Sequence, residues 1–225
     1  MEPMIYKPGA YKTPGVYKGV GGIYNGRGVY NDGLQEFVEI GGKKYPVVKI
    51  GFQKWLGIDL NFIFDGLIVG ASGDSYTEPR ANYYNNDELN YGSYGLLYNW
   101  IAAKYLNDNK LTLLNGFRVP TKSDYDILIS FVQNNASLLK TKYGWDNSGN
   151  GTNKTKFSSF PLGHHYSNNY AEFGHSANYI CLDFFYGSNP HGNYYNKYLT
   201  SDSNVIRQGE PGIMHQMSLR LIHDV

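Results

Sequence analysis

The sequence predicts an α+β fold in which two helices pack against a small, mostly antiparallel sheet with long loops. Three observations predict this class. Residues 36–57 alternate apolar and polar side chains around a Gly-Gly pair, two stretches between residues 96 and 132 carry apolar residues at helical spacing, and the chain beyond residue 142 reads as short strands and loops. A length of 225 residues suits one main domain with a short extra segment better than two full domains.

The extra segment is the first 35 residues, where tyrosine recurs between glycine and proline at Tyr6, Tyr11, Tyr17, Tyr24 and Tyr30. Such a low-complexity segment has hardly any aliphatic cluster to bury and gains order by packing on something else. We therefore expect residues 1–35 to form an attachment or oligomerisation arm, with a simple flexible tail as the alternative, and residues 36–225 to form the main domain.

The main domain is expected to begin with a β-hairpin. Apolar and polar residues alternate on both sides of Gly41 and Gly42, and a Gly-Gly pair between two such runs is typical of a tight hairpin turn. Residues 61–94 are rich in Gly, Asn, Asp and Tyr, and we expect them to form a long loop.

Two helices are expected after this loop. Leu97, Trp100, Ile101 and Lys104 lie at helical spacing and predict a helix with a mainly apolar face near residues 96–106. Further on, a hydroxyl residue is followed three positions later by an acid, a pair that can satisfy the free amides that open a helix. The residues of this second, amphipathic helix are the pair Thr121 and Asp124 and then Tyr125, Leu128, Ile129 and Val132 at i, i+3, i+4 and i+7.

The last strand is expected near the C-terminus, because successive side chains of a strand point to opposite faces of the sheet. In this interpretation Met217, Leu219 and Leu221 point inward, while Ser218 and Arg220 point outward. The strand would therefore bury one face only.

Charge and cysteine content exclude several classes of protein. The net charge of +1 gives no field that would attract nucleic acid or an anionic membrane. No run reaches the roughly 18 apolar residues of a membrane helix, and the N-terminus lacks an apolar stretch of signal-peptide length. Cys181 is the only cysteine, so neither an intramolecular disulfide nor a two-thiol redox centre can form, and we expect this side chain to be a small buried apolar group.

The residues also fail to support catalysis or a metal centre. No Gly-x-Ser-x-Gly elbow is present to position a hydrolase nucleophile. His164, His165, His175 and Asp183 could in principle hold a transition metal, but exposed loop histidines explain them more simply. The glycine-rich residues 19–28 lack the third glycine of a dinucleotide loop. We therefore expect no enzyme, no cofactor and no metal.

The composition instead favours a binding surface. The chain has 22 Tyr and 27 Gly with abundant Asn and Ser, and charged residues make up only 17%. Tyrosine offers large, stiff contact area, while Ser, Gly and Asn supply adaptable hydrogen bonds, and binding loops converge on this mixture. The alternative is a β- and turn-rich fold, which uses the same residues for structural reasons.

The order of motifs over roughly residues 44–225 resembles that of the Fibrobacter succinogenes major paralogous domain family. The segments that carry the resemblance are VKIGFQKWLGIDLN, YGLLYNWIAA, GFRVPTKSDYDIL, GTNKTKFSSFPLGHH and SLRLIHD, of which GFRVPT at residues 116–121 is the most specific. The resemblance implies the C-type-lectin-like fold shared with formylglycine-generating enzymes. Those enzymes work through paired cysteines, which this chain lacks, and calcium-lectin loops are replaced here by Glu78-Pro79-Arg80 and Trp145-Asp146-Asn147.

Within this broad fold, some phage and bacterial binding proteins carry C-terminal contact residues that retroelements diversify to Tyr, Asn, Ser, His, Asp or Gly. Residues 164–206 resemble such a surface. The predicted ligand-binding residues are His165, Tyr166, Asn168, Tyr170, Asn178, Tyr179, Tyr186, Asn189, His191, Asn193, Tyr194, Tyr195 and Asn196.

The resemblance therefore implies a non-enzymatic adhesin or receptor-binding protein. Its tyrosine-rich N-terminal arm is similar to leader segments of tail or fibre proteins of phages from gut Bacteroides-type hosts. We expect a homo-oligomer on the virion, or otherwise on the bacterial surface by a non-classical route, that binds a host-surface glycan or protein and joins other fibre subunits through its arm. The alternative is a structural virion or cell-surface protein whose tyrosine-rich face joins subunits. No nucleic-acid partner and no membrane insertion are expected.

Overall fold

The structure is a computed structural model that describes residues 23–24, 27–28, 35–70, 74–187 and 189–223. The predicted arm at residues 1–35 thus lies outside the described residues, apart from Gln35 and the two short antiparallel strands β1 (Ile23–Tyr24) and β2 (Arg27–Gly28). The remainder is a mixed α+β structure with two larger sheets and a few short helices, as the sequence predicts at this coarse level.

The predicted hairpin is confirmed, and it begins the smaller sheet. Gly41 and Gly42 have φ values of 58° and 76°, a left-handed conformation that glycine adopts without steric cost and that a two-residue hairpin turn requires. The order of strands in this five-stranded sheet is β3 (Glu36–Ile40), β4 (Lys43–Ile50), β5 (Gln53–Leu56), β16 (Ile222–His223) and β9 (Phe117–Arg118). The chain's last described strand therefore lies between β5 and β9, two strands that come more than 100 residues earlier in the sequence.

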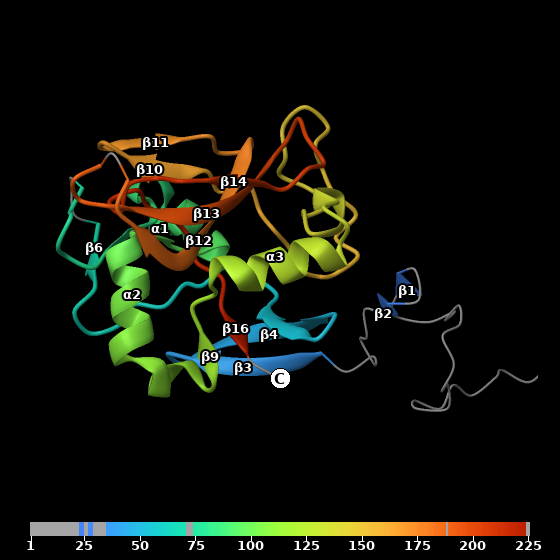
Figure 1. Cartoon of the computed structure of the whole chain (residues 1–225), viewed down its shortest axis with the longest axis horizontal. Coiled ribbons are helices and arrows are strands. Elements are labelled where there is room, and N and C mark those ends of the chain that lie inside the picture. Colours follow the sequence, from blue (N-terminus) through green and yellow to red (C-terminus); the bar gives the residue numbers. More distant parts are fainter. Residues whose placement is uncertain (1–22, 25–26, 29–34, 71–73, 188, 224–225) are drawn as a thin grey trace, which may run out of the picture.

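The larger sheet has seven strands and includes β12, the longest strand of the described chain. The strand order is β14 (Arg207–Gly209), β13 (Asn193–Thr200), β12 (Ser176–Phe185), β15 (Met217–Ser218), β8 (Leu97–Tyr98), β7 (Arg80–Asn82) and β6 (Ile68–Val69). The pairs β12–β15 and β6–β7 are parallel, while the other neighbours are antiparallel. A separate hairpin, β10 (His164–Tyr166) with β11 (Asn169–Ala171), lies beside this sheet (Figure 1).

Both predicted helices are present. The first, α2 (Trp100–Asn109), starts later than expected because Leu97 and Tyr98 form a strand and the Asn99 side chain accepts a hydrogen bond from the amide of Ala102. The second, α3 (Lys122–Phe131), begins with the predicted capping box of Thr121 and Asp124.

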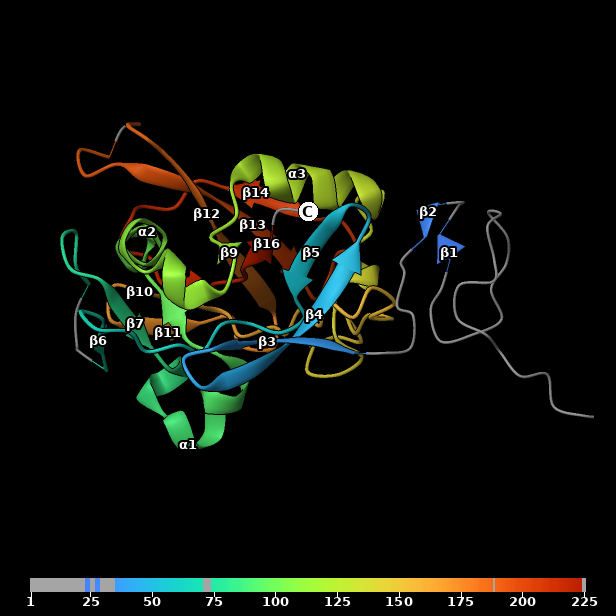
Figure 2. The same ribbon diagram turned by 90° about the horizontal axis from the view of Figure 1, so that it is seen from below.

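The predicted long loop at residues 61–94 contains more regular structure than expected. Besides β6 and β7 it forms the short helix α1 (Glu88–Tyr91) and the single-turn 3₁₀ helices η1 (Tyr84–Asn86) and η2 (Gly92–Tyr94). Two further 3₁₀ turns are η3 (Leu111–Leu114) and η4 (Ala136–Leu138). Figure 2 shows α1 and α3 on opposite sides of the molecule.

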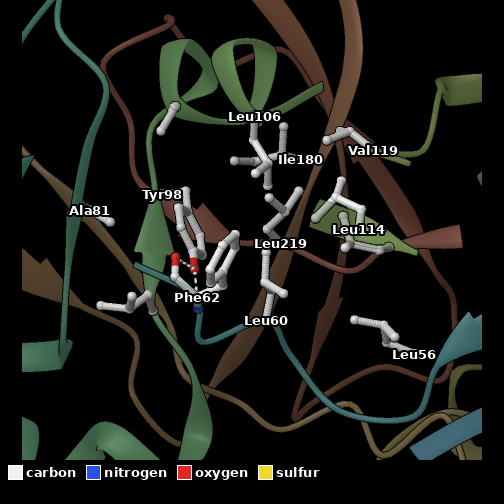
Figure 3. Close-up of a cluster of buried hydrophobic side chains, with 14 of the residues drawn as sticks. Leu56, Leu60, Phe62, Ala81, Tyr98, Leu106, Leu114, Val119, Ile180 and Leu219 are labelled. Atoms are coloured by element: carbon white, nitrogen blue, oxygen red, sulfur yellow. Dashed lines mark hydrogen bonds between the residues drawn. The ribbon is translucent and has the colours of Figure 1, made fainter. Parts of the chain in front are cut away.

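Each long helix covers its own hydrophobic core. The first core joins α2 to residues of both sheets, among them Leu56, Tyr98, Ile180 and Leu219, and Figure 3 shows the Tyr98 hydroxyl bonded to the backbone of Phe62 within it. The second core joins α3 to the other faces of the same strands, with Trp55, Tyr179 and Leu199. Strand β12 is thus covered on both faces. Cys181 lies in the second core and is completely buried, as predicted.

The predicted orientation of the C-terminal strand is wrong in one respect. Met217, Leu219 and Leu221 are buried, but Ser218 and Arg220 are buried as well, with no exposed surface. Arg220 can stay inside because its guanidinium pairs with the carboxylate of Asp59, which is also buried. The stretch therefore runs between the two sheets as β15 and β16 rather than along a solvent face.

Candidate functional site

The structure divides the predicted ligand-binding residues into three groups. Exposed side chains are Tyr166, Asn168, Tyr186 and His191. Half-buried ones are Tyr170, Asn189, Asn193 and Tyr195. The remaining five were also predicted to face solvent, but the structure buries them: His165, Asn178, Tyr179, Tyr194 and Asn196.

Four of these five residues lie on β12 and β13, and the position of these strands inside the larger sheet explains their burial, while His165 lies on β10. Tyr179 points into the second core and donates a hydrogen bond to Ser159 Oγ at 2.8 Å, while Tyr194 points into the first core and donates to the carbonyl of His215 at 3.2 Å. A strand covered on both faces has no outward side, so period-two alternation cannot expose every second residue. These tyrosines support the fold and do not line a surface.

The exposed members gather with residues from elsewhere in the chain on one surface, which we call the loop face. It is built by four segments, residues 74–78, 164–171, 186–193 and 210–216, of which residue 188 is not described. Figure 1 shows β10 and β11 at the end of the molecule away from the five-stranded sheet. Two stacked pairs of rings join these segments.

The first ring pair joins the segments 74–78 and 186–193. Tyr76 stacks on His191 with ring centroids 3.8 Å apart and planes 25° from parallel. Tyr76 is 38% exposed, so part of this pair remains open to solvent. Next to it, Tyr186 is 79% exposed and meets the edge of Phe184.

The second ring pair joins the hairpin to the segment 210–216. Tyr166 stacks on His215 at 3.9 Å with planes 14° from parallel, and Tyr166 is 40% exposed. Gly212 lies between the two pairs, because a Cβ placed there would approach Asn189 Nδ2 at 2.9 Å and His215 Cδ2 at 3.9 Å. The two ring pairs therefore belong to one continuous surface.

The β10–β11 hairpin is held in place at several points. Its two turn residues, Ser167 and Asn168, have φ values of 53° and 64°, the left-handed conformation of a tight hairpin turn. The Ser167 amide donates to Asp74 Oδ2 at 2.7 Å, and the Tyr170 hydroxyl donates to Asn86 Oδ1 at 2.7 Å. His165 also exchanges both backbone hydrogen bonds with Gln216. The ring of Tyr166 is thus presented by a fixed support.

Burial keeps the histidines beneath this face uncharged near neutral pH. Desolvation lowers the pKa of His165, opposed by Asp74, whose Oδ1 lies 3.6 Å from His165 Nδ1. Desolvation, together with His164 and His165, lowers the pKa of His215 to about 4. The described residues of the four segments contain no lysine or arginine, so the face carries little positive charge at pH 7.

Sequence reasoning missed three members of this surface. Asp74 and Tyr76 lie in the stretch interpreted as a featureless loop, and His215 lies beyond the predicted region at residues 164–206. A tyrosine and an acid in a glycine-rich loop were the available signal, but nothing in their sequence position places them beside residues 167 and 191.

The loop face offers rings for stacking and polar side chains for hydrogen bonding. Among the described residues, no three His, Cys, Asp or Glu side chains come together as a possible metal site. Burial raises the pKa of the Cys181 thiol, which makes this group a poor nucleophile. No helix of the described chain is long and apolar enough to cross a membrane.

The protein is thus an α+β domain in which two large hydrophobic cores support an aromatic surface formed by loops. Comparison with protein families shows which family it is: the Fibrobacter succinogenes major domain matches residues 48–222, and the chain belongs to that family. The family predicted from the motifs is therefore confirmed, over nearly the range expected. Neither a curated protein nor a solved structure matched the chain.

Proposed function

We propose that this protein is a non-enzymatic adhesin or receptor-binding protein that recognises a host-surface glycan or protein through its loop face. The observation that carries the proposal is the pair of ring stacks, Tyr76 on His191 and Tyr166 on His215, which hold partly exposed tyrosines in fixed positions across four chain segments. Rigid tyrosines surrounded by small polar residues make contacts at low entropy cost. Loops held by a stable scaffold are the usual site of recognition.

The proposal also includes a C-type-lectin-like fold and a location on a phage tail or fibre. The α+β architecture, with two long helices and extended loops, is compatible with a C-type-lectin-like domain, and the family membership supports it through the motifs noted above. In this proposal the loop face corresponds to the surface that retroelements diversify in phage and bacterial binding proteins. Residues 1–35 would attach the domain to a tail or fibre, and several copies would offset weak single-site affinity through avidity.

A cell-binding experiment tests the proposal. Fluorescently labelled full-length protein is mixed with a panel of Bacteroides-type gut bacteria, and bound protein is measured by flow cytometry. The variant Tyr166→Ala with His191→Ala should bind about tenfold less than the unchanged protein, because each substitution removes one ring of a stack. Tyr143→Ala is the matched control, since Tyr143 is 64% exposed and lies outside the four segments.

Two outcomes would count against the proposal. Equal binding by the double variant and the control would remove the loop face from recognition. Light scattering of the isolated protein tests the structural alternative. Oligomers that dissociate in the double variant but not in Tyr143→Ala would mean that the loop face joins subunits instead of binding a host ligand.

A further inference from the structure

We infer that the ligand of the loop face is a neutral carbohydrate, bound by stacking of pyranose rings on Tyr76, Tyr166 and Tyr186. This inference rests on the proposed function and narrows it to one class of ligand. The protein ligand that the proposal also allows becomes an outcome of the test.

The geometry of the rings is the first argument. In each stack the histidine covers one face of its tyrosine, at 3.8 Å for Tyr76 and 3.9 Å for Tyr166, and both tyrosines remain more than a third exposed. The face of an aromatic ring is electron-rich, and the axial C–H groups of a pyranose carry partial positive charge, so the two pack favourably face to face. Flat, fixed rings at several places on one surface suit a chain of sugar units.

The kind of apolar surface is the second argument. The exposed large aliphatic side chains of the described residues lie outside the four segments: Ile63, Ile68, Leu89, Leu111, Leu113, Ile127 and Val205. The loop face exposes aromatic rings instead. A protein partner usually buries a mixed centre of aromatic, aliphatic and arginine side chains, whereas a sugar needs ring faces with polar groups close by.

The polar groups around the rings are the third argument. Ser167, Asn168 and Asn169 are exposed beside Tyr166, and amide and hydroxyl groups can both donate to and accept from sugar hydroxyls. Tyr76, Tyr166 and Tyr186 are partly or largely exposed, and their hydroxyls can likewise donate to and accept from a ligand.

Charge decides between neutral and acidic sugars. Sialylated or sulfated chains need arginine or lysine for tight binding. The described residues of the four segments offer neither, and burial lowers the pKa of both His165 and His215, so these rings supply no positive charge at pH 7. Binding should therefore depend little on salt concentration.

The direct test is a glycan array probed with the full chain. The array carries neutral oligosaccharides of hexoses and N-acetylhexosamines beside sialylated and sulfated ones. We expect binding to neutral members only, a loss of about tenfold or more in Tyr166→Ala and Tyr76→Ala, and a much smaller loss in Tyr166→Phe, which keeps the ring. Tyr143→Ala should bind as the unchanged protein does, and thermal unfolding of each variant verifies that it is folded. Preference for the acidic members would overturn the inference.

Treated cells separate this inference from the proposed function. Periodate cleaves the vicinal diols of surface glycans, while protease removes surface proteins. Binding that is lost after periodate and kept after protease supports a carbohydrate ligand. The reverse result overturns the inference and leaves the proposed function standing with a protein ligand, whereas failure to bind even untreated cells of the panel contradicts both.

Discussion

Arg220 lies between β15 and β16, and its buried guanidinium contacts Leu56, Asp59 and Phe157. Its Nε donates to Asp59 Oδ1 at 2.9 Å, its Nη1 donates to the carbonyls of Leu56 and Phe157, and its plane lies over the Phe157 ring at 4.2 Å. Burial raises the pKa of Asp59, and the charge of Arg220 opposes that shift. A buried charge is tolerated only when it is paired and hydrogen-bonded, and this one is.

Tyr194 and Tyr166 illustrate how the same residue type serves two purposes here. Tyr194 has no exposed surface and lies in the first core, so Tyr194→Ala should lower the free energy of unfolding by about 3–5 kcal/mol, as truncation of a buried aromatic does. Tyr166 is 40% exposed, and Tyr166→Ala should cost about 1 kcal/mol or less. Urea unfolding of the two variants measures both values. Similar losses in the two variants would mean that the loop face is part of the core.

Helix α3 gives the clearest case of a local sequence signal that fixes an element. The amide of Asp124 donates to Thr121 Oγ1 at 3.2 Å, and the amide of Thr121 donates to Asp124 Oδ2 at 2.7 Å. Hydrogen bonds to the carboxylate lower the pKa of Asp124, although burial acts in the opposite direction and is the largest single effect. Thr121 and Asp124 lie within four residues of each other, so the start of the helix can be predicted from the sequence.

The substitution Thr121→Ala removes this cap. It should lower the free energy of unfolding by about 1 kcal/mol, because the amide of Asp124 loses its acceptor at the helix start. Ser123→Ala is the control, since Ser123 is exposed in the same turn of the helix and makes no cap. The midpoint of thermal unfolding reports both changes, and an unchanged midpoint for Thr121→Ala would show that tertiary packing alone sets this end of α3.

The elements that the sequence predicts well are those with local causes. The Gly41–Gly42 turn, the cap of α3 and the apolar stripe of Tyr125 and Leu128 each depend on residues near one another in the chain. The burial of β12 and β13 was harder to predict, because α3, which covers one of their faces, lies more than 40 residues earlier in the chain. Their tyrosines and asparagines look like surface residues until that layer is known.

The same limit applies to the loop face as a whole. Tyr166 and His191, two of its exposed C-terminal members, were predicted from residue type together with the resemblance to diversified binding loops. Their partners His215 and Tyr76 were not, because contacts across 49 and 115 positions depend on the sheet order. Sequence composition can thus suggest residues of an exposed surface, but the contacts among them follow only from the fold.

His165, which is buried, and His215, which is half-buried, link this surface to the stability of the entire domain. A histidine whose pKa is lowered by folding binds fewer protons when folded than when unfolded, so acid favours the unfolded chain. For His215 the relevant window runs from its ordinary pKa of 6.5 down to about 4, and His165 acts in the same direction. The carboxylates of Asp124 and Asp126, whose pKa values are lowered from 3.8, lose their contribution only below that window.

We therefore expect the urea midpoint to fall as the pH is lowered from about 7.5 to about 5. In His215→Gln this fall should be smaller, because the variant retains a polar side chain but no longer titrates at this position. The unchanged protein and the variant share every other titrating group, so the difference in slope isolates one histidine. Identical slopes in the two proteins would mean that folding leaves the pKa of His215 unchanged, although its ring stacks on Tyr166.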